Sequence, residues 1–130
     1  MNILIADDYA HVRNGLGEIL ADALPDAFFS EAVDGNDVLA QLAGSEFAVL
    51  LLDINMPGRS GLEVLADVKR IYPRLPVIIV SVHPEEQYAI RCLQAGAAAY
   101  ICKDSVTEHL ARMTKMILSG GGCVLGLQTD

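Results

Sequence analysis

The chain has 130 residues, 52% of them hydrophobic, which is typical of one compact domain with its own core. Its 17 acidic and 9 basic side chains give a net charge of −8, which argues against direct binding to a nucleic-acid backbone, because such binding needs clustered Lys and Arg. No apolar run approaches the roughly 18 residues of a membrane span, and the start lacks a signal-peptide pattern, so we expect a cytoplasmic protein without membrane contact. Its three cysteines, which lack metal-ligand spacing, are expected to be buried free thiols.

Short apolar segments alternate with longer amphipathic segments along the chain. The apolar segments are NILIA (2–6), AFFSEAV (27–33), FAVLLL (47–52), PVIIVSV (76–82) and AAAYIC (97–102). The amphipathic segments predict helices over residues 9–24, 36–43, 61–72, 84–95 and 106–118. Continuous apolar strands that alternate with helices predict a doubly wound α/β fold, in which a five-stranded parallel sheet carries helices on both faces.

The helix boundaries carry recognisable signals. Two helices are expected to begin with a capping box, in which a serine precedes a glutamate by three residues. The two pairs are Ser60 with Glu63 and Ser105 with Glu108. Three glycines at 120–122 end the last helix, and the pattern stops there. We therefore expect one domain over residues 1–120 and a tail or part of a linker over residues 121–130.

Polar and charged residues stand at the carboxyl ends of four of the predicted strands. They are Asp7 and Asp8 after the first strand, Asp53 after the third, Ser81 at the fourth and Lys103 after the fifth. Because the carboxyl ends of parallel strands meet at one edge of the sheet, we expect these side chains to lie close together. Each residue alone has an ordinary interpretation, such as a helix cap, a loop hydroxyl or a surface lysine. Their joint placement indicates a functional site.

The residue types at these positions indicate phosphoryl chemistry. Three adjacent carboxylates repel and raise one another's pKa unless a cation compensates, and Mg²⁺ prefers such oxygen ligands while leaving positions open for phosphate oxygens. Phosphoryl transfer depends mainly on positioning and charge neutralisation. We expect Lys103 and Ser81 to contact phosphoryl oxygens while the Asp53 carboxylate acts as the nucleophile, which makes an aspartyl phosphate.

Four stretches of the sequence resemble the receiver domain of two-component response regulators, and the match extends over residues 1 to about 120. The stretches are ADD after the first strand, LLLDINMPGRSGLEVL, VIIVSVH and AAAYICKDS. The resemblance implies a flavodoxin-like sheet of strand order 2-1-3-4-5. It also implies that a sensor histidine kinase phosphorylates Asp53. In this family pattern Asp8 and Asp53 bind Mg²⁺ directly, Asp7 acts largely through a bound water, and the backbone carbonyl of Asn55 completes the protein ligands.

The same resemblance implies a conformational switch. Ser81 would move toward the phosphoryl group and Tyr100 would turn inward behind it, which changes an output surface made by the fourth helix, the fifth strand and the fifth helix. Such a protein is not an enzyme in the usual sense, because it catalyses only its own phosphoryl transfer and dephosphorylation.

The stretch SVHPEEQYAIRCLQAGAAAYICKDS is similar to the NarL/FixJ subgroup, whose receivers precede a LuxR-type helix-turn-helix DNA-binding domain. The triplet Lys103-Asp104-Ser105 is common in this subgroup, whereas many other receivers have a proline shortly after the lysine. This similarity implies transcription regulation through a DNA-binding domain absent from this sequence, and homodimerisation on phosphorylation is compatible with it. The chain is then either an excised domain or a stand-alone receiver.

Other functions on related folds fit the sequence less well. A haloacid-dehalogenase-like phosphohydrolase usually carries a second aspartate where this chain has Asn55, and it carries a cap domain that this length excludes. A flavin carrier needs a phosphate-binding loop after the first strand, but ADDYAHVRNG is acidic there. An unphosphorylated interaction module stays open. His83 is either a modulator near the site or a solvated loop residue, and Arg59 is expected to be a loop cation.

Overall fold

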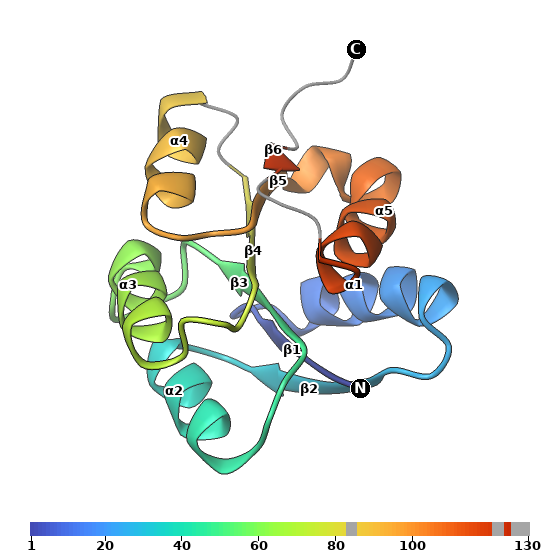
Figure 1. The fold of residues 1–130 in the computed structure, drawn as a ribbon, viewed down its shortest axis with the longest axis horizontal. Helices are drawn as coiled ribbons and strands as arrows, with labels where there is room; N and C mark the ends of the chain where they lie inside the picture. Colours follow the sequence, from blue (N-terminus) through green and yellow to red (C-terminus); the bar gives the residue numbers. More distant parts are fainter. Residues whose placement is uncertain (83–85, 121–123, 126–130) are drawn as a thin grey trace.

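The computed structural model describes residues 1–82, 86–120 and 124–125 and shows a central parallel sheet between two layers of helices (Figure 1). The strands are β1 (Asn2–Ala6), β2 (Phe28–Ala32), β3 (Val49–Asp53), β4 (Val77–Ser81), β5 (Ala99–Cys102) and β6 (Val124–Leu125). The helices are α1 (Ala10–Ala23), α2 (Gly35–Gly44), α3 (Gly61–Ile71), α4 (Glu86–Gln94) and α5 (Val106–Leu118), with a 3₁₀ turn, η1 (Lys103–Ser105), before α5.

The strand order of the sheet is β2-β1-β3-β4-β5-β6, and every neighbouring pair is parallel. The predicted order 2-1-3-4-5 is therefore confirmed for the first five strands. The sixth strand was not predicted: Val124 pairs with Ala99 and Leu125 with Tyr100. The free edge of β5 offers unpaired backbone groups that any extended segment can pair with. Such pairing does not depend on a hydrophobic pattern, so no signal for it appears in the sequence.

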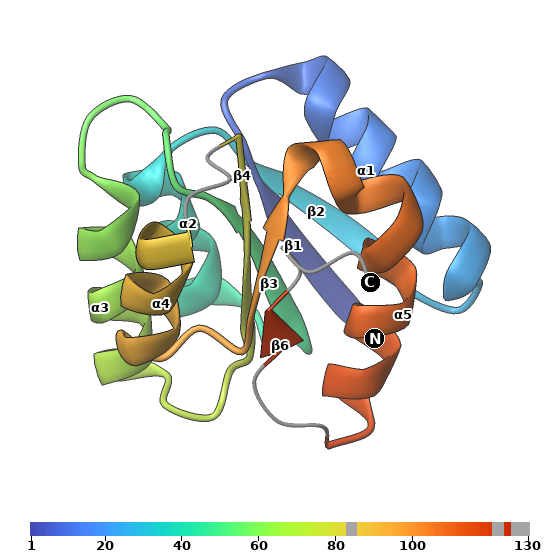
Figure 2. The same ribbon diagram turned by 90° about the horizontal axis from the view of Figure 1, so that it is seen from above.

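Two hydrophobic layers cover the sheet, one on each face. Figure 2 shows α1 and α5 on one face and α2, α3 and α4 on the other. Alternate residues of β1 illustrate the division, because Leu4 packs with the layer of α2, α3 and α4 while Ile3 and Ile5 pack with that of α1 and α5. Burial on both faces explains why the central strands are continuously apolar.

The helix boundaries agree with the sequence pattern at one capping box and differ at the other. The Ser60 side chain accepts the amide of Glu63 at 3.2 Å, and the Glu63 side chain reciprocates, so this capping box is confirmed. The prediction for Ser105 is wrong, because its side chain makes no capping bond in the described part of the chain. Ser105 ends the 3₁₀ turn with φ −110° and ψ 4°, which is not the extended conformation that a capping residue needs. The predicted helix start at residue 84 lies outside the described residues.

Cys92 and Cys102 are buried free thiols, as predicted, while Cys123 lies outside the described residues. Burial raises the pKa of the Cys92 thiol to about 11, with the nearby charge of Arg91 acting in the opposite direction. Cys92 is therefore protonated and unreactive near neutral pH. Within the part of the chain that the structure describes, no helix is long and apolar enough to cross a membrane.

Candidate functional site

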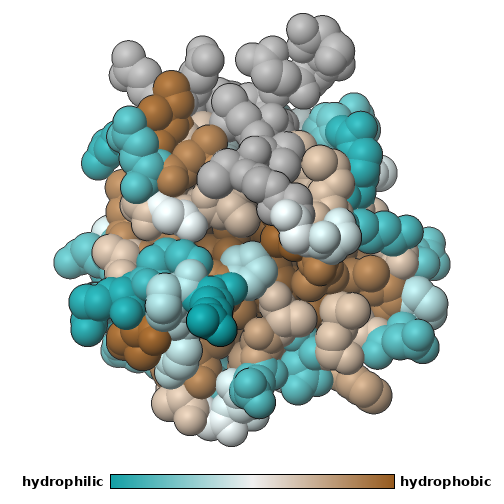
Figure 3. Space-filling view, viewed as in Figure 1, coloured by the Kyte–Doolittle hydropathy of each residue, from teal (hydrophilic) through white to brown (hydrophobic). Residues whose placement is uncertain are grey.

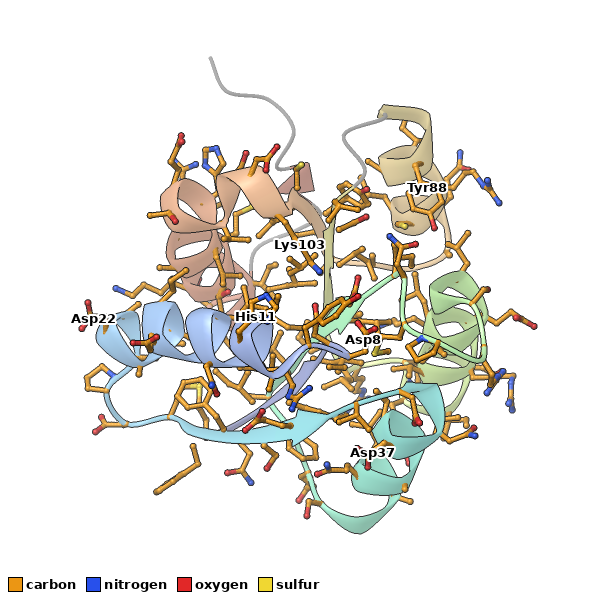
Figure 4. All side chains as sticks on the ribbon, turned by 180° about the vertical axis from the view of Figure 1, so that it is seen from behind. Asp8, His11, Asp22, Asp37, Tyr88 and Lys103 are labelled. Carbon is orange, nitrogen blue, oxygen red and sulfur yellow. The ribbon has the colours of Figure 1, made fainter. Side chains whose placement is uncertain are left out.

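The predicted site residues lie at the carboxyl edge of the sheet, where β1, β3, β4 and β5 end. The register pairs Asp53 with Val80 and Ser81 with Cys102, which aligns the ends of these central strands. Figure 4 faces this edge and shows Asp8 and Lys103 near its centre, with Asp22 at the far end of α1. The fold therefore delivers these side chains to one place from separate segments of the chain.

Three carboxylates form the centre of the site. One oxygen from each of Asp7, Asp8 and Asp53 lies within 4.8 Å of the others. Asp7 is 0% exposed and Asp53 is 3% exposed, whereas Asp8 is half-buried. The Lys103 ammonium lies 2.9 Å from Asp7 Oδ2 and 3.7 Å from Asp53 Oδ2. One lysine therefore faces three carboxylates, which leaves excess negative charge in a poorly hydrated site.

The pKa of Asp53 reflects this imbalance. Burial raises the pKa of the Asp53 carboxyl, and the charges of Asp7 and Asp8 raise it further. The hydrogen bond from the Asn55 amide and the charge of Lys103 act in the opposite direction. The net shift is upward, so the ionised form that a nucleophile requires is disfavoured unless more positive charge is present.

The donor set fits a hard divalent cation. Asp8 Oδ1 is buried and has no hydrogen-bond partner among the described residues, although it is close to the other two carboxylates. A buried anionic oxygen without a partner is costly, and a bound cation would compensate it. Oxygen ligands with open positions around them are the kind that Mg²⁺ takes in proteins. The acidic pocket therefore has the chemistry of a Mg²⁺ site.

The loop after β3 places Asn55 beside Asp53. The Asn55 amide donates to Asp53 Oδ1 at 3.1 Å, while the Asn55 side chain is exposed. Ile54 and Met56 are buried on either side of Asn55. The amide of Gly61 donates to the Ile54 carbonyl at 3.1 Å, and a Cβ at Gly61 would lie only 2.5 Å from Ile54 backbone atoms. Close packing of α3 on this loop thus holds Asn55 in place.

Ser81 and Tyr100 form a second, uncharged part of the site. Both are fully buried. Burial raises the pKa of Tyr100 to about 12, while the hydrogen bond with Ser81 acts in the opposite direction. The Tyr100 ring also packs edge-on against Tyr88 of α4, with ring centroids 6.4 Å apart. Tyr100 is therefore turned inward and links Ser81 to α4.

The structure thus brings Asp7, Asp8, Asp53 and Lys103 together and places Ser81 at the end of β4, hydrogen-bonded to Tyr100 within β5. Arg59 instead forms an ion pair with Asp67 of α3, so it is a loop cation as expected. His83 lies outside the described residues.

Sequence reasoning missed one residue of this region. The Arg13 side chain donates to the backbone carbonyl of Asp7 at 2.7 Å and pairs with Glu31 at 2.5 Å. A contact from a side chain to a backbone carbonyl depends on geometry and leaves no mark in residue types or spacing. An arginine five residues after Asp8 was therefore not distinguishable from an ordinary helix-surface cation.

Comparison with known proteins agrees with this arrangement. The family model of the response regulator receiver domain matches residues 3–115. The chain is 30% identical to the transcriptional regulatory protein DegU of Brevibacillus brevis, over 95% of this chain and 52% of DegU. It is 32% identical to the response regulator GacA of Pseudomonas aeruginosa, over 92% of this chain and 56% of GacA. The chain spans about half the length of these curated relatives.

Solved structures show the same likeness. The signal receiver domain of NarL from Mycobacterium tuberculosis superposes with a TM-score of 0.81 at 28% identity, covering 92% of this chain and 96% of that domain. A LuxR family DNA-binding response regulator from Silicibacter pomeroyi gives a TM-score of 0.83 at 27% identity, covering 96% of this chain and 95% of the other. The match of the family model over most of the sequence shows that the chain belongs to the response regulator receiver domain family.

Proposed function

We propose that the chain is a phosphorylation-activated switch in which Asp53 accepts a phosphoryl group from a sensor histidine kinase. The observation that carries this proposal is the placement of Asp53 at the end of β3, 3% exposed, beside two more carboxylates and 3.7 Å from the Lys103 ammonium. A buried carboxylate in this setting is poorly suited to a structural role, because its charge is not fully compensated.

The chemistry follows from the groups present. A carboxylate oxygen of Asp53 attacks the phosphorus of a phosphohistidine, the P–O bond forms as the P–N bond breaks, and the leaving imidazole nitrogen takes a proton from water. Lys103 neutralises one phosphoryl oxygen and the Ser81 hydroxyl donates to another. Asp8, Asp53 and the Asn55 carbonyl would hold Mg²⁺, with Asp7 acting through a water, and the ion would neutralise charge on the phosphoryl oxygens. The chain catalyses only its own phosphorylation and dephosphorylation.

The Ser81–Tyr100 hydrogen bond supports a route from this site to the surface. When Ser81 turns to a phosphoryl oxygen, its bond with Tyr100 must change. Tyr100 contacts Tyr88, so the change reaches α4 and then the surface formed by α4, β5 and α5. Phosphorylation therefore alters the affinity of this output surface for a partner, which in this proposal includes a second copy of the chain.

We further propose that the output is transcription regulation through a helix-turn-helix domain outside these 130 residues. Two observations support this role: the relative DegU is a transcriptional regulatory protein, and the similar protein from Silicibacter pomeroyi is a DNA-binding response regulator. The net charge of −8 is consistent with a receiver that leaves DNA contact to another domain.

The test is intact-protein mass after incubation with the small-molecule donor phosphoramidate, with and without Mg²⁺. We expect one labile phosphoryl adduct on the wild type that requires Mg²⁺ and is absent from Asp53→Asn. Asp104→Asn, which changes an exposed acid next to Lys103, is the matched control and should keep the adduct. An adduct that persists in Asp53→Asn would contradict the proposal. No adduct and no Mg²⁺ binding would favour the unphosphorylated interaction module.

A further inference from the structure

We propose that Arg13 is a positioning residue of this site, which fixes the peptide between Asp7 and Asp8 and thereby directs the Asp8 carboxylate into the acidic cluster. This inference rests on the proposed function, because it assigns Arg13 a part in assembling the Mg²⁺ ligands. Among the described residues, Arg13 donates no hydrogen bond to the side-chain carboxylates of Asp7, Asp8 or Asp53.

Arg13 joins three elements with one side chain. It lies near the start of α1, and its side chain is only 12% exposed. Its Nη1 donates to the carbonyl oxygen of Asp7 at 2.7 Å, just beyond the end of β1. Its Nε pairs with Glu31 Oε1 on β2 at 2.5 Å, which orients the guanidinium. The short, charge-assisted bond to the carbonyl therefore comes from a group that is itself held in place.

The carbonyl of Asp7 belongs to the peptide that leads into Asp8. The Asp7 amide already donates to the Ala32 carbonyl at 3.1 Å, which continues the pairing of β1 with β2. With the bond from Arg13, both backbone polar groups of Asp7 are fixed. Rotation of the following peptide would change the direction in which the Asp8 side chain leaves the loop, so Arg13 controls that direction.

The two neighbouring carboxylates depend on this peptide to different degrees. The Asp7 side chain is held by the Tyr9 amide at 2.9 Å and by Lys103 at 2.9 Å. Asp8 Oδ1 has no such partner among the described residues. The position of the Asp8 carboxylate is therefore set mainly by the backbone that carries it, and the backbone is set by Arg13.

An arginine suits this task better than a lysine. The planar guanidinium donates through two different nitrogens at once, to Asp7 and to Glu31, whereas a lysine offers a single ammonium on a flexible stem. Arg13→Lys keeps the positive charge but cannot keep both bonds in the same geometry. This variant separates the effect of charge from the effect of positioning.

The experiment measures Mg²⁺ affinity by titration calorimetry and amide exchange by NMR, on the wild type, Arg13→Ala and Arg13→Lys. Removing a partner that orients a metal ligand typically costs between tenfold and a hundredfold in metal affinity, so we expect Arg13→Ala to raise the Mg²⁺ dissociation constant about tenfold. The Mg²⁺ dissociation constant of Arg13→Lys should lie between those of the wild type and Arg13→Ala. Saturating Mg²⁺ should restore the phosphorylation rate of Arg13→Ala toward that of the wild type, because Arg13 touches no reacting atom.

The matched control is Lys69→Ala. Lys69 likewise holds backbone carbonyls, since its Nζ donates to Pro73 at 3.0 Å and to Leu75 at 2.7 Å, but it lies at the opposite edge of the sheet. We expect Lys69→Ala to keep the wild-type Mg²⁺ affinity. Equal affinity in Arg13→Ala and the wild type, or an equal loss in Lys69→Ala, would overturn the inference.

The amide-exchange measurement tests the inference independently of Mg²⁺. Arg13→Ala should accelerate exchange of the Tyr9 amide, which bonds to Asp7, and Lys69→Ala should leave this exchange unchanged. A wild type that binds no Mg²⁺ and accepts no phosphoryl group would count against the proposed function. Unchanged Tyr9 exchange in Arg13→Ala would count against the positioning role itself.

Discussion

The two edges of the central sheet differ in whether their charged groups have partners that compensate their charge. At the amino edge, a cavity of about 330 Å³ lies between the segments around Phe47 and Tyr72. Figure 3 faces this edge and shows apolar and polar residues side by side near its centre. The nearby Lys69 ammonium is satisfied by the carbonyls of Pro73 and Leu75. At the carboxyl edge, three carboxylates lie together and the Lys103 ammonium pairs with two of them, Asp7 and Asp53.

This difference shows that hollow space alone does not identify the functional site of this molecule. The amino edge offers a cavity whose charged lining residues, Glu46 and Arg74, are exposed, whereas the carboxyl edge combines buried acids with Asp8 Oδ1, an oxygen that lacks a partner in the described part of the chain. Uncompensated buried charge is costly to keep in a folded protein, so its presence indicates a role beyond stability.

The largest expected effect is that of Lys103→Met, which removes the ammonium but keeps an apolar stem. Without Mg²⁺ we expect a loss of ~3 kcal/mol in the free energy of unfolding, because the buried Asp7 loses its charged partner. Mg²⁺ should recover much of this loss. Urea unfolding with and without Mg²⁺ measures both effects. Lys115→Met, a change at an exposed lysine, is the control. An equal loss of unfolding free energy in both variants would contradict the claim that the carboxyl edge holds uncompensated charge.

Substitution of a glycine near each edge should give opposite results. A Cβ at Gly61 would lie 2.5 Å from Ile54 backbone atoms, so Gly61→Ala should cost about 2 kcal/mol and loosen the loop that carries Asn55. At the amino edge, no described atom lies within 4 Å of a Cβ at Gly44. Gly44→Ala should stabilise by about 0.5 kcal/mol. Thermal unfolding of the two variants tests both expectations. Similar changes in the midpoint temperature of unfolding would contradict the tight packing at Gly61.

A smaller effect is expected from Tyr100→Phe. Loss of the buried hydroxyl that bonds to Ser81 should cost about 1 kcal/mol of unfolding free energy. The same change at Tyr9, which is 57% exposed, should cost less. A double-mutant cycle with Ser81→Ala measures the coupling between the two hydroxyls, and additive losses would show that they do not interact.

The smallest expected effect is the pH dependence of Asp53, because Lys103 and the Asn55 amide oppose the upward shift of its pKa. A carboxyl with a raised folded-state pKa stabilises the fold below its ordinary pKa of 3.8 and loses that contribution as the pH rises through the higher value. The wild type should therefore lose stability relative to Asp53→Asn as the pH rises above 3.8. Urea unfolding without Mg²⁺ checks this trend, which a constant difference would contradict.

Much of the fold could be predicted because its signals are local. Mostly apolar segments of five to seven residues marked β1 to β5, and the predicted last helix has the same bounds as α5. The predictions failed where tertiary contacts decide the structure. The 3₁₀ turn before α5 displaced the expected cap at Ser105, and the pairing of Val124 with Ala99 depends on a distant strand edge.

The candidate site, like the fold, could be predicted from the sequence only in part. The positions of Asp7, Asp53 and Lys103 at strand ends were enough to predict that they meet, because parallel topology places all carboxyl ends at one edge. The hydrogen bond from Arg13 to the Asp7 carbonyl was not predictable, because every residue has a backbone carbonyl and the sequence does not mark which one accepts a hydrogen bond. That Asp8 Oδ1 has no hydrogen-bond partner among the described residues is likewise visible only in three dimensions.

The most direct test of the central claim is to locate the phosphoryl group by borohydride reduction, which converts an aspartyl phosphate to homoserine. The wild-type chain is incubated with phosphoramidate and Mg²⁺, reduced, digested and sequenced by mass spectrometry. We predict homoserine at position 53 and unmodified aspartate at Asp7 and Asp8. Reduction at Asp7 or Asp8 with Asp53 unmodified would contradict the assignment of Asp53 as the phosphoacceptor.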